Sequence, residues 1–168
     1  GAGLGLAGCI LQAILHNPLA SASTLGVSQG ASFGAAFAIV TLNLTGGVAI
    51  SLWSFIGSIA VAAVILGLSR LKQVSAEGIV LAGVAISSML GGATTLIQYF
   101  ANEIQLANLV FWTFGDLGST DWGDLRGMAL MVLVLIVYCT FHRWDYNALL
   151  NGEETAVSLG IHVQQLTL

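Results

Sequence analysis

The sequence is organised around the stretch His16-Asn-Pro-Leu-Ala-Ser-Ala-Ser-Thr-Leu-Gly-Val-Ser-Gln-Gly30, which separates two uncharged apolar segments. The stretch holds the only proline of the chain, Pro18. A proline ring cannot continue a helix, and it biases the preceding Asn17 away from the helical region. We therefore expect one helix to end near His16 and a second to begin before Gly30.

Small polar side chains between the two segments offer caps for the second helix. The hydroxyl groups belong to Ser21, Ser23, Thr24 and Ser28. Such oxygens accept hydrogen bonds from the first free backbone N–H groups of a helix. Gly26 and Gly30 allow another backbone to approach closely. An ordinary polar turn between two helices explains the same residues, because an Asn-Pro turn alone is not specific.

The composition places the chain in the membrane. Of its 168 residues 57% are hydrophobic and 7% are charged, and no Asp, Glu, Lys or Arg precedes Arg70. A soluble domain is usually about 25% charged, so a chain this apolar could not cover its surface with polar groups. The net charge is −4, and no basic patch indicates binding to nucleic acid. The expected fold class is an all-α, polytopic integral membrane protein.

Apolar segments divide the chain into membrane spans of roughly 20 residues. The five expected spans are 1–15, 28–44, 48–69, 78–101 and 122–141. A shorter apolar segment, 105–114, predicts a helix lying at the interface. The sequence begins inside an apolar segment without Met, so we expect residues 1–168 to be a fragment of a single transmembrane domain.

The basic residues predict the orientation of these spans. Arg70, Lys72 and Arg143 fall on one face, and Arg126 falls alone on the other. Lys and Arg are enriched in cytoplasmic loops. We therefore expect the N-terminus outside and the segment after residue 142 in the cytoplasm.

Several strings in this chain occur together in one known family. They are Gly-Ala-Gly-Leu-Gly-Leu-Ala-Gly at 1–8, Asn-Pro-Leu-Ala at 17–20, Leu-Gly-Val-Ser-Gln-Gly at 25–30 and Phe-Trp-Thr-Phe-Gly-Asp-Leu-Gly at 111–118. The sequence resembles the permease family of binding-protein-dependent ABC importers for iron-siderophores, haem and cobalamin. The resemblance implies the second to sixth helices of a permease of about ten helices. It also implies four partners: an ABC ATPase subunit, an extracytoplasmic substrate-binding protein, a second permease subunit forming a homodimer, and the lipid bilayer of a prokaryotic cytoplasmic membrane.

Small residues recur every four positions in the span 78–101, at Gly83, Ser87, Gly91 and Thr95. Such a stripe lets another helix approach closely. Packing within the same subunit is the commoner explanation. In the family that the chain resembles, the equivalent helix lines the central pathway, so we expect this face to serve both packing and pathway.

Two cytoplasmic turns are candidates for residues near a gate. They contain Ser28 and Gln29 in the first turn, and Ser75, Ala76 and Glu77 in the second. Residues 74–77 resemble the family's turn before its fifth helix, where the pathway narrows. Glu77 departs from the family pattern, and its position also fits an ordinary helix N-terminus, where the helix dipole favours a carboxylate.

The C-terminal segment 151–168 predicts a short helix. Asn151 and Glu154 have capping-box spacing, and Gly160 stands where a glycine would end the helix. Residues 152–160 also resemble the family's coupling helix, which docks on the ATPase. The resemblance implies contacts by Glu153, Glu154, Ala156, Ser158, Leu159 and Gly160. The alternative is a short interfacial helix resting on its own permease.

Other functions find little support in the sequence. There is no Gly-x-x-x-x-Gly-Lys-Ser/Thr phosphate loop, no nucleophile–base pair and no ligand spacing among the histidines, so we expect neither an enzyme nor a cofactor or metal. Cys9 and Cys139 are expected to be small packing residues. The rival interpretations are an ion-coupled secondary transporter or channel and a structural membrane subunit. The former usually carries an ionisable residue at mid-membrane, which the spans here lack.

Overall fold

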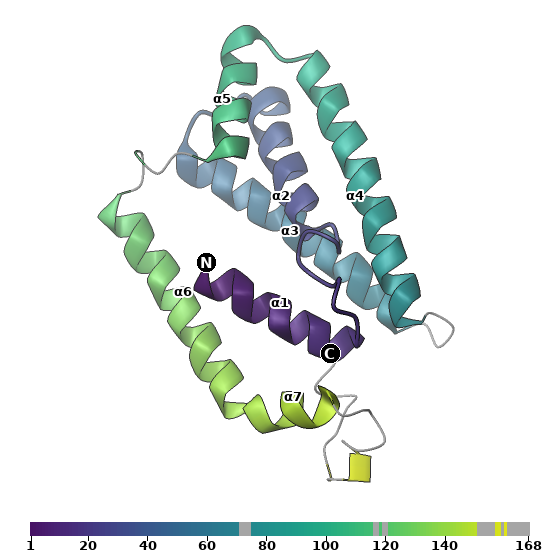
Figure 1. Cartoon of the computed structure of the whole chain (residues 1–168). Helices are drawn as coiled ribbons and strands as arrows, with labels where there is room; N and C mark the ends of the chain where they lie inside the picture. Colours follow the sequence, from purple (N-terminus) through teal and green to yellow (C-terminus); the bar gives the residue numbers. More distant parts are fainter. Residues whose placement is uncertain (71–74, 116–117, 119–120, 151–156, 159, 161–168) are drawn as a thin grey trace. The chain divides into compact units, whose positions relative to one another are not determined.

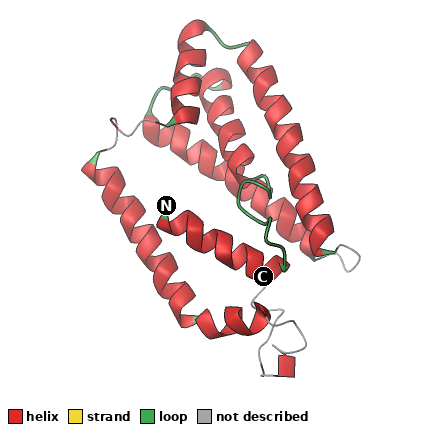
Figure 2. Ribbon diagram, in the orientation of Figure 1, coloured by secondary structure: helices red, strands yellow, loops and turns green. Residues whose placement is uncertain are grey.

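A computed structural model describes residues 1–70, 75–115, 118, 121–150, 157–158 and 160. Regular structure in these residues is helical throughout, as expected (Figures 1 and 2). The helices are α1 (Ala2–Leu15), α2 (Val27–Ala36), the π-helix η1 (Phe37–Thr41), α3 (Gly47–Ser69), α4 (Ala76–Tyr99), α5 (Glu103–Phe114), α6 (Trp122–Phe141) and α7 (Arg143–Leu150). Two compact units result: Ser23–Ser119 carries α2 to α5, whereas Gly1–Ala22 and Thr120–Leu168 carry α1, α6 and α7.

The end of α1 confirms the interpretation of the proline stretch. Leu15 is the last helical residue, and His16 adopts a left-handed conformation with φ 46°. The side-chain amide of Gln12 donates to the Pro18 carbonyl at 2.9 Å, and Leu19 N–H donates to the Asn17 side chain at 2.9 Å. The backbone groups that the proline displaces from the helix are therefore partly satisfied by local side chains.

The N-cap of α2 is a glycine and not one of the expected hydroxyl residues. Gly26, with φ 82°, occupies this position. Left-handed φ is natural for glycine and strained for most other residues. Glycine fits this position because the turn lies against α4, and the space between them is too small for a side chain.

The second expected span ends earlier than Leu44. After Ala36 the helix widens into η1, in which Leu42 N–H donates to the Phe37 carbonyl five residues earlier at 3.1 Å. Asn43 then turns the chain with φ 53°. Helical structure from Val27 to Thr41 is therefore shorter than the predicted segment 28–44.

Glycines on α2 and α3 bring the two backbones into contact. A Cβ on Gly30 would lie 2.6 Å from the Gly57 carbonyl oxygen, and a Cβ on Gly34 would collide with the Trp53 carbonyl. The reverse also holds, because a Cβ on Gly57 would collide with the Gly30 carbonyl. Helices this close gain dispersion contacts along the whole crossing. This contact fixes how α2 crosses α3.

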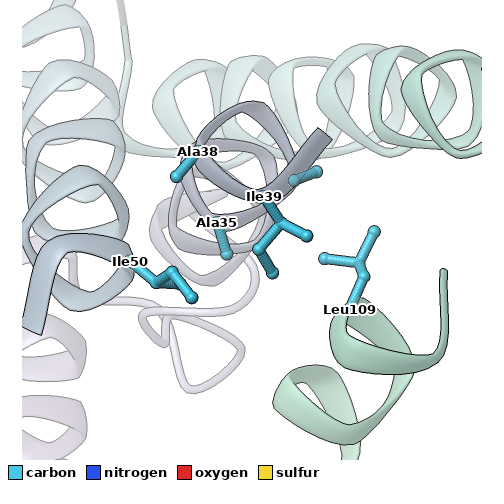
Figure 3. Packing of buried hydrophobic residues seen from close by; sticks show 6 residues of the cluster. Ala35, Ala38, Ile39, Ile50 and Leu109 are labelled. Atoms are coloured by element: carbon cyan, nitrogen blue, oxygen red, sulfur yellow. The ribbon is translucent and has the colours of Figure 1, made fainter. Parts of the chain in front are cut away.

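A hydrophobic cluster lies at the far end of the same crossing (Figure 3). Ala35 and Ile39 come from α2 and η1, Ile50 comes from α3, and Leu109 comes from α5. Leu109 is fully buried, although its neighbours on both sides of the sequence are exposed. Small alanines near the helix crossing and larger side chains beside them fill the space between these four elements.

The other unit joins α1 to α6 and α7. A Cβ on Gly3 would lie 3.1 Å from a methyl group of Val132, so α1 passes close to α6 there. At the opposite end of α1, the His16 ring N–H donates to the Leu149 carbonyl of α7 at 2.8 Å. The sequence did not predict α7. It bends by 62° from α6, and its first turn follows His142.

Helices α1, α3, α4 and α6 begin and end within two residues of an expected span. Not every helix in an expected span is long enough to cross a membrane. By length and composition, α3 and α4 could each cross a membrane, and the bent pair α6–α7 could form a third span. Ala2–Leu15 and Val27–Thr41 are apolar but shorter than the roughly 20 residues that a crossing needs.

Gly57→Ala tests the backbone contact. The new methyl group would force α2 and α3 apart, and overpacking of this kind costs about 1–3 kcal/mol. Gly67→Ala on the same helix is the matched control, because no atom of the described residues lies within 4 Å of its Cβ position. We expect a lower thermal denaturation midpoint in detergent for Gly57→Ala only. Equal midpoints would contradict the contact.

Candidate functional site

The small-residue stripe of α4 has two different halves. Gly83 is buried, and a Cβ on it would lie 2.7 Å from the Leu25 Cα. The Ser87 hydroxyl donates to the Ser23 carbonyl at 3.4 Å, and Gly26 packs on the same turn of α4. The structure thus brings Gly83 and Ser87 together with the segment that precedes α2. Packing within the subunit accounts for this half of the stripe.

The second half of the stripe meets no other part of the described chain closely. No atom lies within 4 Å of a Cβ placed on Gly91. Thr95 is exposed, and its hydroxyl donates to the Gly91 carbonyl of its own helix at 3.0 Å. This face of α4 is available to lipid or to another polypeptide.

The first candidate turn has become the start of a helix. Ser28 and Gln29 lie in the first turn of α2, and both are exposed. The Ser28 carbonyl accepts a hydrogen bond from the Ser32 hydroxyl at 3.2 Å. These two side chains therefore project from the helix that Gly26 anchors against α4.

The second candidate turn begins α4. Ser75 is the N-cap, and its side-chain oxygen accepts from Gly78 N–H at 3.2 Å. Ala76 is the first helical residue and is half-buried. Glu77 is exposed in the first turn, where the helix dipole favours its charge. The ordinary role of a capped helix start is sufficient for all three residues.

The helix predicted for residues 105–114 is present as α5, and its N-terminus has a cap that sequence analysis missed. Asn102 accepts from Gln105 N–H at 2.8 Å, while the Gln105 side chain accepts from Asn102 N–H at 3.1 Å. The same Gln105 side chain donates to Asn43 at 3.1 Å. The spacing Asn-x-x-Gln was the available signal for this reciprocal cap. Gln105 thereby joins α5 to the turn between η1 and α3.

An open cavity of about 610 Å³ lies between α5 and the start of α3. It is lined by Ile39, Thr45, Ile50, Asn108, Phe111, Trp112 and Gly115. Trp112, from the string 111–118 that resembles the family, packs against the hydrophobic cluster of Figure 3. Phe111 and Phe114 are exposed. The remaining motif residues Asp116 and Leu117 lie outside the described residues.

Most of the expected coupling contacts lie outside the described residues. These are Glu153, Glu154, Ala156 and Leu159. Val157 and Ser158 are helical, and Gly160 N–H donates to the Val157 carbonyl at 3.0 Å. Gly160 has φ 82°, a left-handed conformation common for glycine after a helix.

The FecCD transport family matches this chain over residues 1–168. The chain belongs to the FecCD transport family. Two of its relatives in this family are the haemin transport system permease protein HmuU of Yersinia pestis, at 31% identity over the whole chain, and the vitamin B12 import system permease protein BtuC of Klebsiella pneumoniae subsp. pneumoniae, at 33% over 96% of it. A permease protein of an ABC transporter from Methanocaldococcus jannaschii, MJ0087, is 44% identical over the whole chain.

A solved structure supports the same fold. It is an inward-facing conformation of a metal-chelate type ABC transporter, with a TM-score of 0.86 and 26% identity, and it covers 99% of this chain. This chain covers 53% of that one. It also covers 51%, 52% and 48% of the relatives from M. jannaschii, Y. pestis and K. pneumoniae. The chain therefore spans about half the length of the FecCD proteins that it matches.

Ser75→Ala tests the cap at the start of α4. Loss of the side-chain acceptor costs about 0.5–2 kcal/mol at an N-cap, so the Gly78 amide should exchange its hydrogen faster. Ser75→Asp, which keeps an acceptor, is the control and should leave exchange unchanged. Hydrogen–deuterium exchange on peptides covering residues 75–82 measures both. Equal exchange rates in wild type and Ser75→Ala would show that the Ser75 side chain does not stabilise the start of α4.

Proposed function

We propose that the full-length protein is the membrane-spanning permease of a binding-protein-dependent ABC importer in a prokaryotic cytoplasmic membrane. Its substrate class is an iron chelate, haem or a cobalamin-type compound. The single observation that carries the proposal is the family match over the whole chain, together with relatives named for haemin and vitamin B12. Uptake would proceed by ATP-driven alternating access, with hydrolysis on a separate subunit.

The proposed membrane arrangement keeps five spans. They are α1, α2 with η1, α3, α4 and α6. Because α1 and α2–η1 are short for a crossing, the polar segment between them would lie partly below the membrane surface. Non-helical backbone at such depth is tolerated where protein covers it, and the packing of Leu25 and Gly26 on α4 supplies that cover.

The ion-coupled transporter remains the second candidate, but the charge distribution favours the ABC importer. Helix α3 contains no charged residue, and the only one in α4 is Glu77 in its first turn. Secondary transporters usually place ionisable groups at the centre of the bilayer. The free energy for transport would therefore be supplied by a separate subunit, such as an ATPase, and not by an ion that binds within these helices.

The ATPase is proposed to dock on the segment after α7. That segment would present Glu153, Glu154, Ala156, Ser158, Leu159 and Gly160. Support comes from α7, because the His16–Leu149 hydrogen bond ties the helix before this segment to the end of α1. A displacement of the docking segment would therefore be transmitted through α7 and the His16–Leu149 hydrogen bond to the end of α1.

Ala156→Arg in the full-length protein tests this function. The long charged side chain should not fit a docking groove, so the ATPase should no longer copurify, or hydrolysis should continue without uptake. Lys72→Arg, which keeps the charge on the same membrane face, is the control. Absence of any ATPase from the wild-type preparation would refute the importer, and normal uptake by Ala156→Arg would refute the docking segment alone.

Gly91→Leu tests the proposed pairing of two permeases. Since no atom of the described residues lies within 4 Å of a Cβ placed on Gly91, a leucine there should disturb only a partner that covers this face. We expect the dimer fraction of the full-length protein in size-exclusion chromatography to fall. Leu96→Ile, at an exposed position outside the small-residue stripe, should leave it intact. Equal dimer fractions for both variants would exclude Gly91 from the interface.

A further inference from the structure

The segment Ser23–Gly26 lies along the side of α4 rather than at its end. Helix α4 begins at Ala76, and the segment contacts it at Gly83 and Ser87. At 1.5 Å per residue these positions are about 10 and 16 Å along the helix axis. If α4 crosses the bilayer, this non-helical segment is held well inside the membrane.

The fit between the two surfaces is tight on both sides. A Cβ on Gly83 would lie 2.7 Å from both the Leu25 Cα and the Thr24 carbonyl oxygen. A Cβ on Gly26 would lie 3.1 Å from the Ser87 hydroxyl, and its φ of 82° makes any other residue strained. Neither surface can shift along the other without bringing a side chain into this contact.

Polar contact and burial add to the steric fit. The Ser23 carbonyl accepts from Gly26 N–H at 3.1 Å within the turn, and the Ser87 hydroxyl of α4 donates to the same oxygen at 3.4 Å. Leu25 is 4% exposed and Gly26 is buried. Separation of the two surfaces would expose Leu25 and would remove the interaction of the Ser87 hydroxyl with the Ser23 carbonyl, so lost packing and a lost hydrogen bond would both oppose it.

We propose that Gly83 and Ser87 are positioning residues that lock the segment Ser23–Gly26 to α4, so that both move as one body during transport. The inference rests on the proposed function and deepens it. A displacement of α4 then carries the start of α2, with the exposed Ser28 and Gln29, in the same direction. The polar side chains before α2 are displaced without any sliding between the segment and α4.

The experiment uses the full-length permease with its ATPase in proteoliposomes, after replacement of every native cysteine of the permease, Cys9 and Cys139 among them, by Ala. Ser23→Cys is combined with Ser87→Cys and treated with a short bifunctional thiol reagent. Its matched control combines Ser23→Cys with Gly91→Cys, about 6 Å further along the same helix. The cross-linked fraction is measured without nucleotide and with ATP plus vanadate, and uptake is measured with radiolabelled cobalamin, haemin and a ferric siderophore.

We expect the 23/87 pair to cross-link to the same extent in both nucleotide states, the 23/91 pair to remain largely unlinked, and the linked 23/87 protein to keep its uptake. A 23/87 yield that changes with nucleotide, or uptake that stops on linking and returns on reduction, would overturn the single-body movement. Failure of the 23/87 pair to cross-link in either state would overturn the packing. Failure of the unlinked protein to bind the ATPase or take up any probe would instead count against the proposed function, while a nucleotide-independent 23/87 yield would still support the packing.

Discussion

Backbone contact between α2 and α3 is the constraint on which the unit Ser23–Ser119 depends. Gly30 and Gly34 remove the side chains that would otherwise separate these helices, and Gly57 removes the opposing one. In a membrane, lipid chains are as apolar as leucine, so helices gain little from burying apolar side chains and more from close packing. The hydrophobic cluster around Leu109 and the hold of Gly26 on α4 both follow from this placement of α2.

The same constraint leaves large apolar surfaces uncovered. Side chains such as Leu81 and Met89 on α4 are 74% and 75% exposed. Exposed apolar surface of this extent is covered by lipid or by protein.

Much of the fold could be predicted from the sequence because proline and hydropathy act locally. Pro18 placed the end of α1, and the apolar segments placed α3, α4 and α6. Long-range contacts could not be predicted in this way. Gly26 as the cap of α2 is explained only by Gly83 beside it, which is far away in the sequence. The spacing of the stripe on α4 could not show that, among the described residues, Gly83 is covered by the turn before α2 and Gly91 has no close neighbour. Helix α7 was missed because its mean hydropathy is low and its packing on α1 depends on His16 and Leu149.

Density for the full-length protein in lipid nanodiscs, obtained by electron cryomicroscopy, tests the central claim most directly. The account predicts that the Gly57 carbonyl oxygen lies in van der Waals contact with the backbone of Gly30, with no side chain between α2 and α3 at that level. Helices separated widely enough to admit a lipid chain or a side chain between Gly30 and Gly57 would contradict it.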